Sequence, residues 1–76
     1  MIIQNYNMCQ QGRKIIAKNV SKFREMYGLK REHLSLMIDC DQSYISKLEK
    51  GKINITIDTL EAIAKILKIE LIEFFK

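Results

Sequence analysis

The 76-residue sequence contains no proline and no tryptophan, and it has only three glycines, two cysteines and one histidine. So few turn-forming residues favour helices joined by short turns over many strands joined by many turns. The separated Cys9 and Cys40 give no disulfide framework, and reduced thiols in a chain without a signal peptide indicate the cytoplasm. The role of Cys9 stays open. No apolar run is long enough to cross a membrane.

Residues that could carry chemistry are equally sparse. The sequence has no CxxC or HExxH motif, no paired carboxylates arranged for acid and base catalysis, and no phosphate-binding loop. His33 stands beside Glu32 without a nucleophile or a second metal ligand near it in the sequence. We therefore expect a protein that is not an enzyme and that needs no cofactor, metal ion or small-molecule ligand.

Charge is unevenly distributed along the chain. Thirteen Lys and Arg residues against nine Asp and Glu residues give a net charge of +4. Residues 1–52 contain ten basic and five acidic residues, a net charge of +5, whereas residues 53–76 contain three and four, a net charge of −1. A basic front half favours binding to a polyanion, although the charge alone also fits an ordinary solvated basic protein.

The length allows one domain, in which only ~60% of the unfolded surface becomes buried. Residues 1–12 are polar and unpatterned, which predicts an N-terminal arm before a domain that spans residues 13–76. Apolar residues at helical spacing then predict a first helix over 13–27, closed by Gly28, with an inner face made of Ile16, Val20, Phe23 and Met26.

Three further helices and a final turn follow from the same periodicity. They cover residues 30–38, residues 42–50 with Asp41 as N-cap, residues 56–67 with Thr56 as N-cap, and residues 70–75. Residues 52–57 alternate like a strand, but a single strand has nothing to pair with, so we expect a loop whose isoleucines pack inward. The predicted fold is all-α, a compact bundle of five short helices.

The segment LKREHLSLMIDCDQSYISKLEKG, residues 29–51, resembles the helix-turn-helix family of Cro and phage repressors. Its strongest match is SYISKLEKG, residues 43–51, followed by apolar residues at the family's spacing in 60–67. The resemblance extends from Ile16 to Phe75 and implies a lambda-repressor-like fold and a sequence-specific DNA-binding transcription regulator. The layout is similar to restriction-modification controller proteins and to small prophage repressors alike.

The resemblance also assigns structural roles. Ser35 replaces the family's usual alanine where the two helices cross, and Asp39 replaces the usual glycine in a left-handed turn, at a cost of ~1 kcal/mol. Cys40 occupies a core position, which implies a buried thiol. Arg24 and Glu49 match positions that form an ion pair between the first and third helices. Arg31, Ile55 and Lys68 depart from the family's usual glutamine, proline and glycine.

DNA contacts are implied on the outer face of the third helix and at its flanks. The residues expected to contact bases are Gln42, Ser43, Ser46 and Lys47. The residues expected to contact phosphates are Arg31, Tyr44, Lys50, Lys52 and Asn54. The alternative for each of them is an ordinary solvated surface residue.

Apolar residues near the C-terminus exceed what the family usually shows. Ile66, Ile72 and Phe75 are therefore expected to form a homodimer interface, the alternative being additional core. A homodimer fits a two-fold symmetric operator on double-stranded DNA. An alternative function is an antitoxin-type protein-binding module, but that role calls for a long additional segment that binds the toxin, and only the short N-terminal arm is available here.

Overall fold

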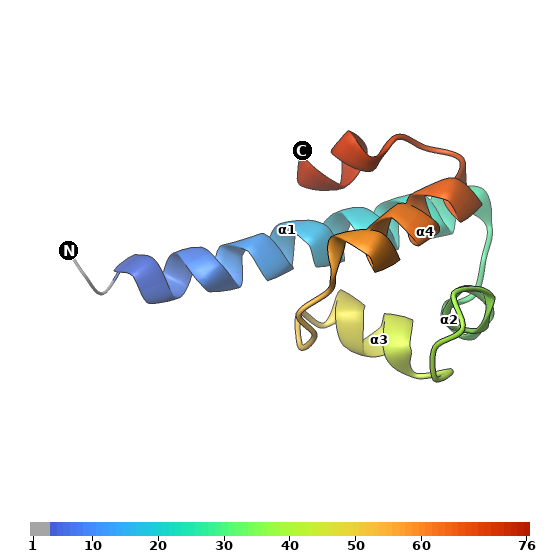
Figure 1. Cartoon of the computed structure of the whole chain (residues 1–76), viewed down its shortest axis with the longest axis horizontal. Coiled ribbons are helices and arrows are strands. Elements are labelled where there is room, and N and C mark those ends of the chain that lie inside the picture. The colour runs from blue at the N-terminus through green and yellow to red at the C-terminus, as the bar shows by residue number, and fades with distance from the viewer. Residues whose placement is uncertain (1–3) are drawn as a thin grey trace.

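Five helical segments follow one another in the computed structural model, which describes residues 4–76 and the side chains of residues 11–76. They are α1 (Gln4–Tyr27), α2 (Arg31–Met37), α3 (Tyr44–Glu49), α4 (Ile57–Leu67) and the 3₁₀-helix η1 (Leu71–Phe75) (Figure 1). The predicted all-α class is confirmed. The count of five short α-helices is not, because α1 has 24 residues and the last segment is a 3₁₀-helix.

Helix α1 begins at Gln4, nine residues before the predicted start, and its N-terminal part projects beyond the other helices (Figure 1). Residues 4–12 are polar and unpatterned, so this part lacks the apolar periodicity on which the prediction rested. Residues 4–12 of the expected arm thus continue α1, while residues 1–3 and the side chain of Cys9 lie outside the described part. Met26 is 72% exposed, so its predicted place on the inner face is wrong.

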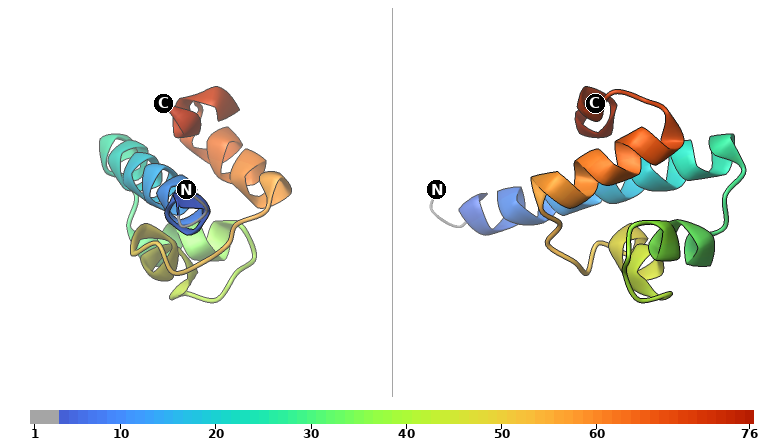
Figure 2. Two further views of the ribbon diagram at one scale, coloured as in Figure 1. Left: turned by 90° about the vertical axis from the view of Figure 1, so that its left-hand side faces the viewer. Right: turned by 45° about the vertical axis from the view of Figure 1, so that its right-hand side comes forward.

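Helix α1 also runs through the middle of the domain and contacts α3, α4 and η1. Helices α2 and α3 lie on one side of it, and η1 lies on the opposite side (Figure 2). The core between them contains the apolar residues of α4 that match the family's spacing, together with apolar residues of the other helices. Those of α4 are Leu60, Ile63, Ala64 and Leu67. Its largest fully buried side chains are Phe74, Leu34, Ile45, Leu48, Leu60, Ile63 and Val20.

The two ends of α4 are fixed by local backbone chemistry. Thr56 Oγ1 accepts a hydrogen bond from the Thr59 amide at 3.2 Å, which confirms the predicted N-cap. Lys68 ends the helix in the left-handed conformation, with φ 59°, where the family usually has glycine. The chain can then turn back into η1.

Helix η1 closes the core through Phe74, which is fully buried. Its ring meets that of Phe23 edge to face, with the ring centres 6.2 Å apart. The buried Asn19 side chain donates to the Phe74 carbonyl at 2.8 Å. Both contacts join the C-terminal segment to α1, so the short 3₁₀-helix is an integral part of the domain.

Residues 52–56 form a loop, as predicted. Ile55 packs against the core, as expected of this loop's isoleucines. Ile57, the first residue of α4, is 54% exposed, so the expectation fails for it. The loop connects α3 to α4, and two of its residues, Lys52 and Asn54, are exposed.

Candidate DNA interface

Helices α2 and α3 are joined at Ser35, which is fully buried. Its hydroxyl accepts a hydrogen bond from the Ile45 amide at 3.0 Å and donates one to the Arg31 carbonyl at 2.9 Å. A small side chain lets the helices approach, as predicted, and the hydroxyl supplies an acceptor to a backbone amide near the start of α3. Ser35 therefore fixes the angle between the helices as well as their spacing.

The turn between these helices depends on two aspartates. Asp39 has φ 60°, the left-handed conformation predicted for it. Asp41 accepts hydrogen bonds from the Ser43 amide, at 3.1 Å, and from the Ser43 hydroxyl. These bonds lower the pKa of the Asp41 carboxyl. Helix α3 starts at Tyr44 after Ser43, two residues later than predicted, so Asp41 stabilises the preceding turn and is not the N-cap.

The four residues predicted to contact bases lie together at the start and along the outer side of α3. Gln42 and Lys47 are exposed, whereas Ser43 and Ser46 are partly exposed. Ile45 and Leu48 anchor the opposite side of the helix in the core. The outer side therefore offers amide, hydroxyl and ammonium groups at its surface.

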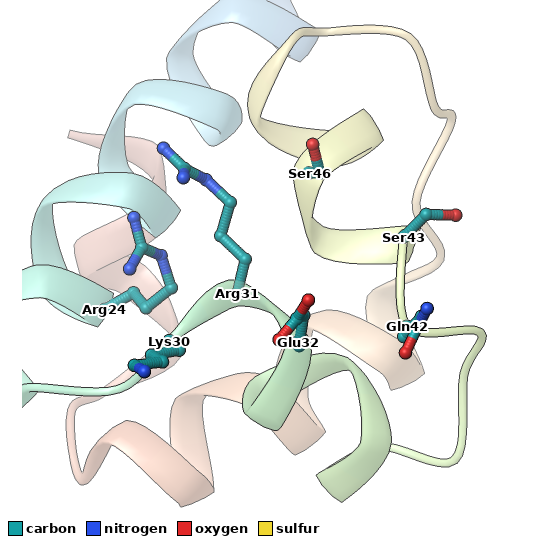
Figure 3. A pocket seen from close by; sticks show the side chains of 7 residues that line it. All are labelled: Arg24, Lys30, Arg31, Glu32, Gln42, Ser43 and Ser46. Atoms are coloured by element: carbon teal, nitrogen blue, oxygen red, sulfur yellow. The ribbon is translucent and has the colours of Figure 1, made fainter.

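An open hollow of about 480 Å³ lies between the start of α2 and the start of α3. Figure 3 shows the side chains around it, with Gln42, Ser43 and Ser46 on one side and Arg31 and Arg24 on the other. Its lining consists of Arg24, Lys30, Arg31, Glu32, Gln42, Ser43 and Ser46. Every one of these side chains is polar or charged, so the hollow suits a hydrated polar surface better than an apolar ligand.

The residues predicted to contact phosphates flank α3, with one exception. Lys50, Lys52 and Asn54 follow the helix and are exposed, and Arg31 begins α2. Tyr44 is half-buried and packs against the core, and this burial raises the pKa of its hydroxyl. The Tyr44 ring thus helps to seat α3 against the core, and its expected phosphate contact stays a prediction.

Arg24 and Glu49 meet across α1 and α3, and both side chains are almost fully buried. Arg24 Nε lies 2.7 Å from Glu49 Oε2, and Arg24 Nη2 lies 3.4 Å from Glu49 Oε1. The remaining nitrogen, Nη1, donates to the Leu29 carbonyl at 2.8 Å. This bidentate contact connects α1 to the end of α3.

Sequence reasoning missed a third member of this cluster. Arg31 Nε also donates to Glu49 Oε1, at 2.7 Å, although Arg31 is 52% exposed in its side chain. The hydrogen bond and the carboxylate charge raise the pKa of Arg31 above its usual value. The only signal in the sequence was the replacement of the family's glutamine by arginine at this position.

The residues expected at a dimer interface differ in exposure. Ile72 is 55% exposed and Phe75 is 47% exposed, both on η1, whereas Ile66 is half-buried and packs against the core. The structure thus brings Ile72 and Phe75 to one segment of the surface. The packing of Ile66 agrees with the alternative prediction that it adds to the core.

The remaining residues considered from the sequence have simple surroundings. Cys40 was expected to be buried but is half-buried. Its thiol donates to the Ile38 carbonyl at 3.6 Å, and the partial burial raises the pKa of this thiol. His33 is exposed. Among the described residues, no three side chains of His, Cys, Asp or Glu could hold a metal ion, and no helix is both long and apolar enough to cross a membrane.

The fold agrees with those of known proteins. The sequence profile described as helix-turn-helix matches residues 20–74, which include all of α2, α3 and α4. The chain therefore belongs to the helix-turn-helix family of DNA-binding transcriptional regulators, as the resemblance implied. Membership of a family of regulators also agrees with the expectation that the chain is not an enzyme.

Individual relatives match most of the chain. An uncharacterized HTH-type transcriptional regulator of Sinorhizobium fredii, y4dJ, is 33% identical over 61 residues, which cover 80% of this chain and 79% of the relative. The crystal structure of the restriction-modification controller protein C.AhdI from Aeromonas hydrophila has a TM-score of 0.79 at 26% identity, covering 87% of this chain and 96% of that one. A hypothetical transcription factor from Neisseria, NHTF, has the same TM-score and identity and covers 84% and 74%.

Proposed function

We propose that the protein regulates transcription as a homodimer that reads a two-fold symmetric DNA operator with α3 in the major groove. The observation that carries this proposal is the division of α3 into two sides. Ile45 and Leu48 are buried, while Gln42, Ser43, Ser46 and Lys47 offer hydrogen-bonding groups at the surface. Base edges in the major groove present complementary donors and acceptors.

Each of the four residues suits a different contact. Lys47 can donate to guanine O6 and N7, and Gln42 can form two hydrogen bonds with an adenine edge. Ser43 and Ser46 are short and would act by close contact or through a bridging water. The bond from the Ser43 hydroxyl to Asp41 limits the orientations of that side chain.

Flanking groups would hold the phosphates on both sides of the groove. Lys50, Lys52 and Asn54 lie beyond the end of α3, Arg31 lies at the start of α2, and Tyr44 would donate from its hydroxyl. Because phosphate contacts carry no sequence information, these residues set affinity and register. Such a regulator acts in the cytoplasm, where its operator is accessible.

Dimerisation would use the exposed apolar side chains of η1. A single short recognition helix reads few base pairs, whereas two copies ~34 Å apart would read one face of the duplex. Ile72 and Phe75 supply apolar surface on one short segment, and Ile66 would contribute its exposed part.

Selection of bound duplexes from a random DNA pool tests the DNA-binding proposal. We expect enrichment of one motif with two inverted half-sites about one helical turn apart. The selected duplex and a scrambled one then serve as specific and non-specific ligands. A pool without any enriched motif after repeated rounds at moderate salt would contradict sequence-specific binding.

Sedimentation of the free protein tests the interface. We expect a dimer for the wild type and a monomer for Ile72→Asp, because a carboxylate cannot be buried unpaired in an apolar contact. Ile57→Asp is the matched control, since Ile57 is 54% exposed and lies on α4 instead of η1. A wild-type protein that stays monomeric at high micromolar concentration, free and on DNA, excludes this dimer.

A further inference from the structure

The Glu49 carboxylate is shared by two arginines from different helices. Oε2 accepts from Arg24 Nε at 2.7 Å, and Oε1 accepts from Arg31 Nε at 2.7 Å. The Glu49 side chain is only 6% exposed. Glu25 Oε2 also lies 3.5 Å from Arg24 Nη2, so the two guanidinium groups share one buried and one exposed carboxylate at the junction of α1, α2 and α3.

The two guanidinium groups are used very differently. Arg24 is 7% exposed in its side chain, and each of its three nitrogens donates to Glu49 or to the Leu29 carbonyl. Arg31 donates to Glu49 through Nε, and its Nη1 and Nη2 groups donate to no other described residue. A guanidinium has five N–H donors, so four of those of Arg31, on Nη1 and Nη2, remain available.

The available end of Arg31 lies beside the outer face of α3. Arg31 lines the hollow that also contains Gln42, Ser43 and Ser46. It lines a second hollow with Ser21, Ser46, Glu49 and Lys50. Figure 3 shows its long side chain extended between α1 and α3, with its guanidinium well away from the α2 backbone.

We propose that Glu49 is a positioning residue that holds Arg31 by Nε while its two Nη groups bind one DNA phosphate as a fork. This inference rests on the proposed DNA-binding function and adds that different nitrogens of one side chain bind Glu49 and the DNA. Arginine suits it because the planar guanidinium can present one edge to a carboxylate and another to a phosphate. A side chain already held in place loses less freedom on binding.

The opposite arrangement is that Arg31 must leave Glu49 before it can reach DNA. In that case the ion pair competes with the phosphate, and weakening the pair strengthens binding. The two arrangements therefore predict changes of opposite sign for the same variant.

The first experiment measures affinity for the selected duplex across a range of salt for Arg31→Lys and Arg31→Ala. Arg31→Lys retains the charge but loses the fork, so we expect binding roughly fivefold weaker with the salt slope unchanged. Arg31→Ala should weaken binding by roughly tenfold or more and lower the slope by about one unit per subunit. Lys22→Ala, which removes an exposed charge from α1, is the control. Arg31→Lys binding as tightly as the wild type would overturn the fork.

The second experiment is a double-mutant cycle with Glu49→Gln, with folding checked by circular dichroism. General electrostatics predicts tighter binding, because the variant is more positive near DNA. Positioning predicts weaker binding, by roughly threefold or more, in the wild type but not when Arg31 is already alanine. Tighter binding, or an equal loss in both backgrounds, contradicts the proposal. If the wild type itself selects no duplex, the DNA-binding function fails instead, so the two failures are distinguishable.

Discussion

Polar residues inside the domain and polar residues on the outer face of α3 are in opposite situations. Within the described residues, no buried side-chain nitrogen or oxygen lacks a hydrogen-bond partner, and Asn19, Arg24 and Ser35 each bond a backbone or side-chain group of another segment. On the outer face, Gln42 and Lys47 form no side-chain hydrogen bond or ion pair with any described residue.

The difference separates two uses of polarity in one small protein. Interior polar groups direct the angles between helices, since each would cost free energy if it lost its partner. Gln42 and Lys47 have no such partner among the described residues, so they can bind another polar surface without breaking a contact inside the domain. A variant of the first kind should change stability, and a variant of the second kind should change binding alone.

The largest effect on stability is expected from Glu49→Ala. This change leaves Arg24 buried with only the Leu29 carbonyl and the outlying Glu25 as partners, so the free energy of unfolding should fall by about 3 kcal/mol. Urea unfolding measures it. Glu61→Ala, an exposed carboxylate on α4, should change stability by less than about 0.5 kcal/mol. A loss below about 1 kcal/mol for Glu49→Ala would mean that this ion pair does not hold the helices together.

A smaller loss, about 1–2 kcal/mol, is expected from Ser35→Ala. The variant removes the acceptor for the Ile45 amide at the buried crossing of α2 and α3 while leaving the space almost unchanged. Thermal or urea unfolding provides the number. Ser21→Ala is a suitable control, because Ser21 is only partly buried on α1. Equal stability of the two variants would refute the role given to the Ser35 hydroxyl.

Gains in stability are expected at Asp39 and Lys68, the two non-glycine residues with left-handed backbone among residues 4–76. Lys68→Gly should stabilise the domain by about 1 kcal/mol, because lysine has no local compensation at φ 59°. Asp39→Gly should gain less, about 0.5 kcal/mol, since aspartate tolerates this conformation better. Urea unfolding of both variants measures the two gains in the free energy of unfolding and shows which is larger. A loss of stability at either position contradicts the claim that the left-handed backbone is strained there.

The smallest expected effect concerns the pKa of Asp41. In the folded state the Ser43 hydroxyl and amide lower it, so this contribution to stability is present above the unfolded-state pKa and is lost as pH falls through the folded-state value. Ser43→Ala should move the pKa of Asp41 back toward its ordinary value. Carboxyl NMR titration detects this, and an unchanged pKa would show that the hydroxyl does not matter.

The sequence predicted those features that repeat along one helix or follow from one turn. The inner face of α4 and the Thr56 cap depend on neighbours within a few residues, and the structure contains both. The left-handed Asp39 is also present, but the resemblance to a family supplied that prediction. The start of α1 was missed because residues 4–12 are polar and unpatterned, so apolar periodicity gives no signal there. Met26 was misplaced because periodicity identifies the inner side of a helix but not where the core ends.

Contacts between distant segments were harder to predict. The bond between Arg31 and Glu49 joins residues 18 apart and depends on the angle between α2 and α3. The Asn19 contact with the Phe74 carbonyl joins residues 55 apart and depends on how η1 folds back. The pairing of Arg24 with Glu49 could be expected only because the resemblance to a family supplied it, since neither spacing nor composition brings the two residues together.

We propose that the outer face of α3 reads DNA sequence, whereas its flanks only hold the backbone. The most direct test is a paired titration of Lys47→Ala and Lys52→Ala on the selected and the scrambled duplex over a range of salt. Lys47→Ala should lose about 1–3 kcal/mol on the selected duplex alone, with relaxed preference at one base pair per half-site. Lys52→Ala should weaken both duplexes alike and lower the salt slope by about one unit per subunit. Equal weakening of both duplexes by Lys47→Ala would contradict the claim and make Lys47 a phosphate contact.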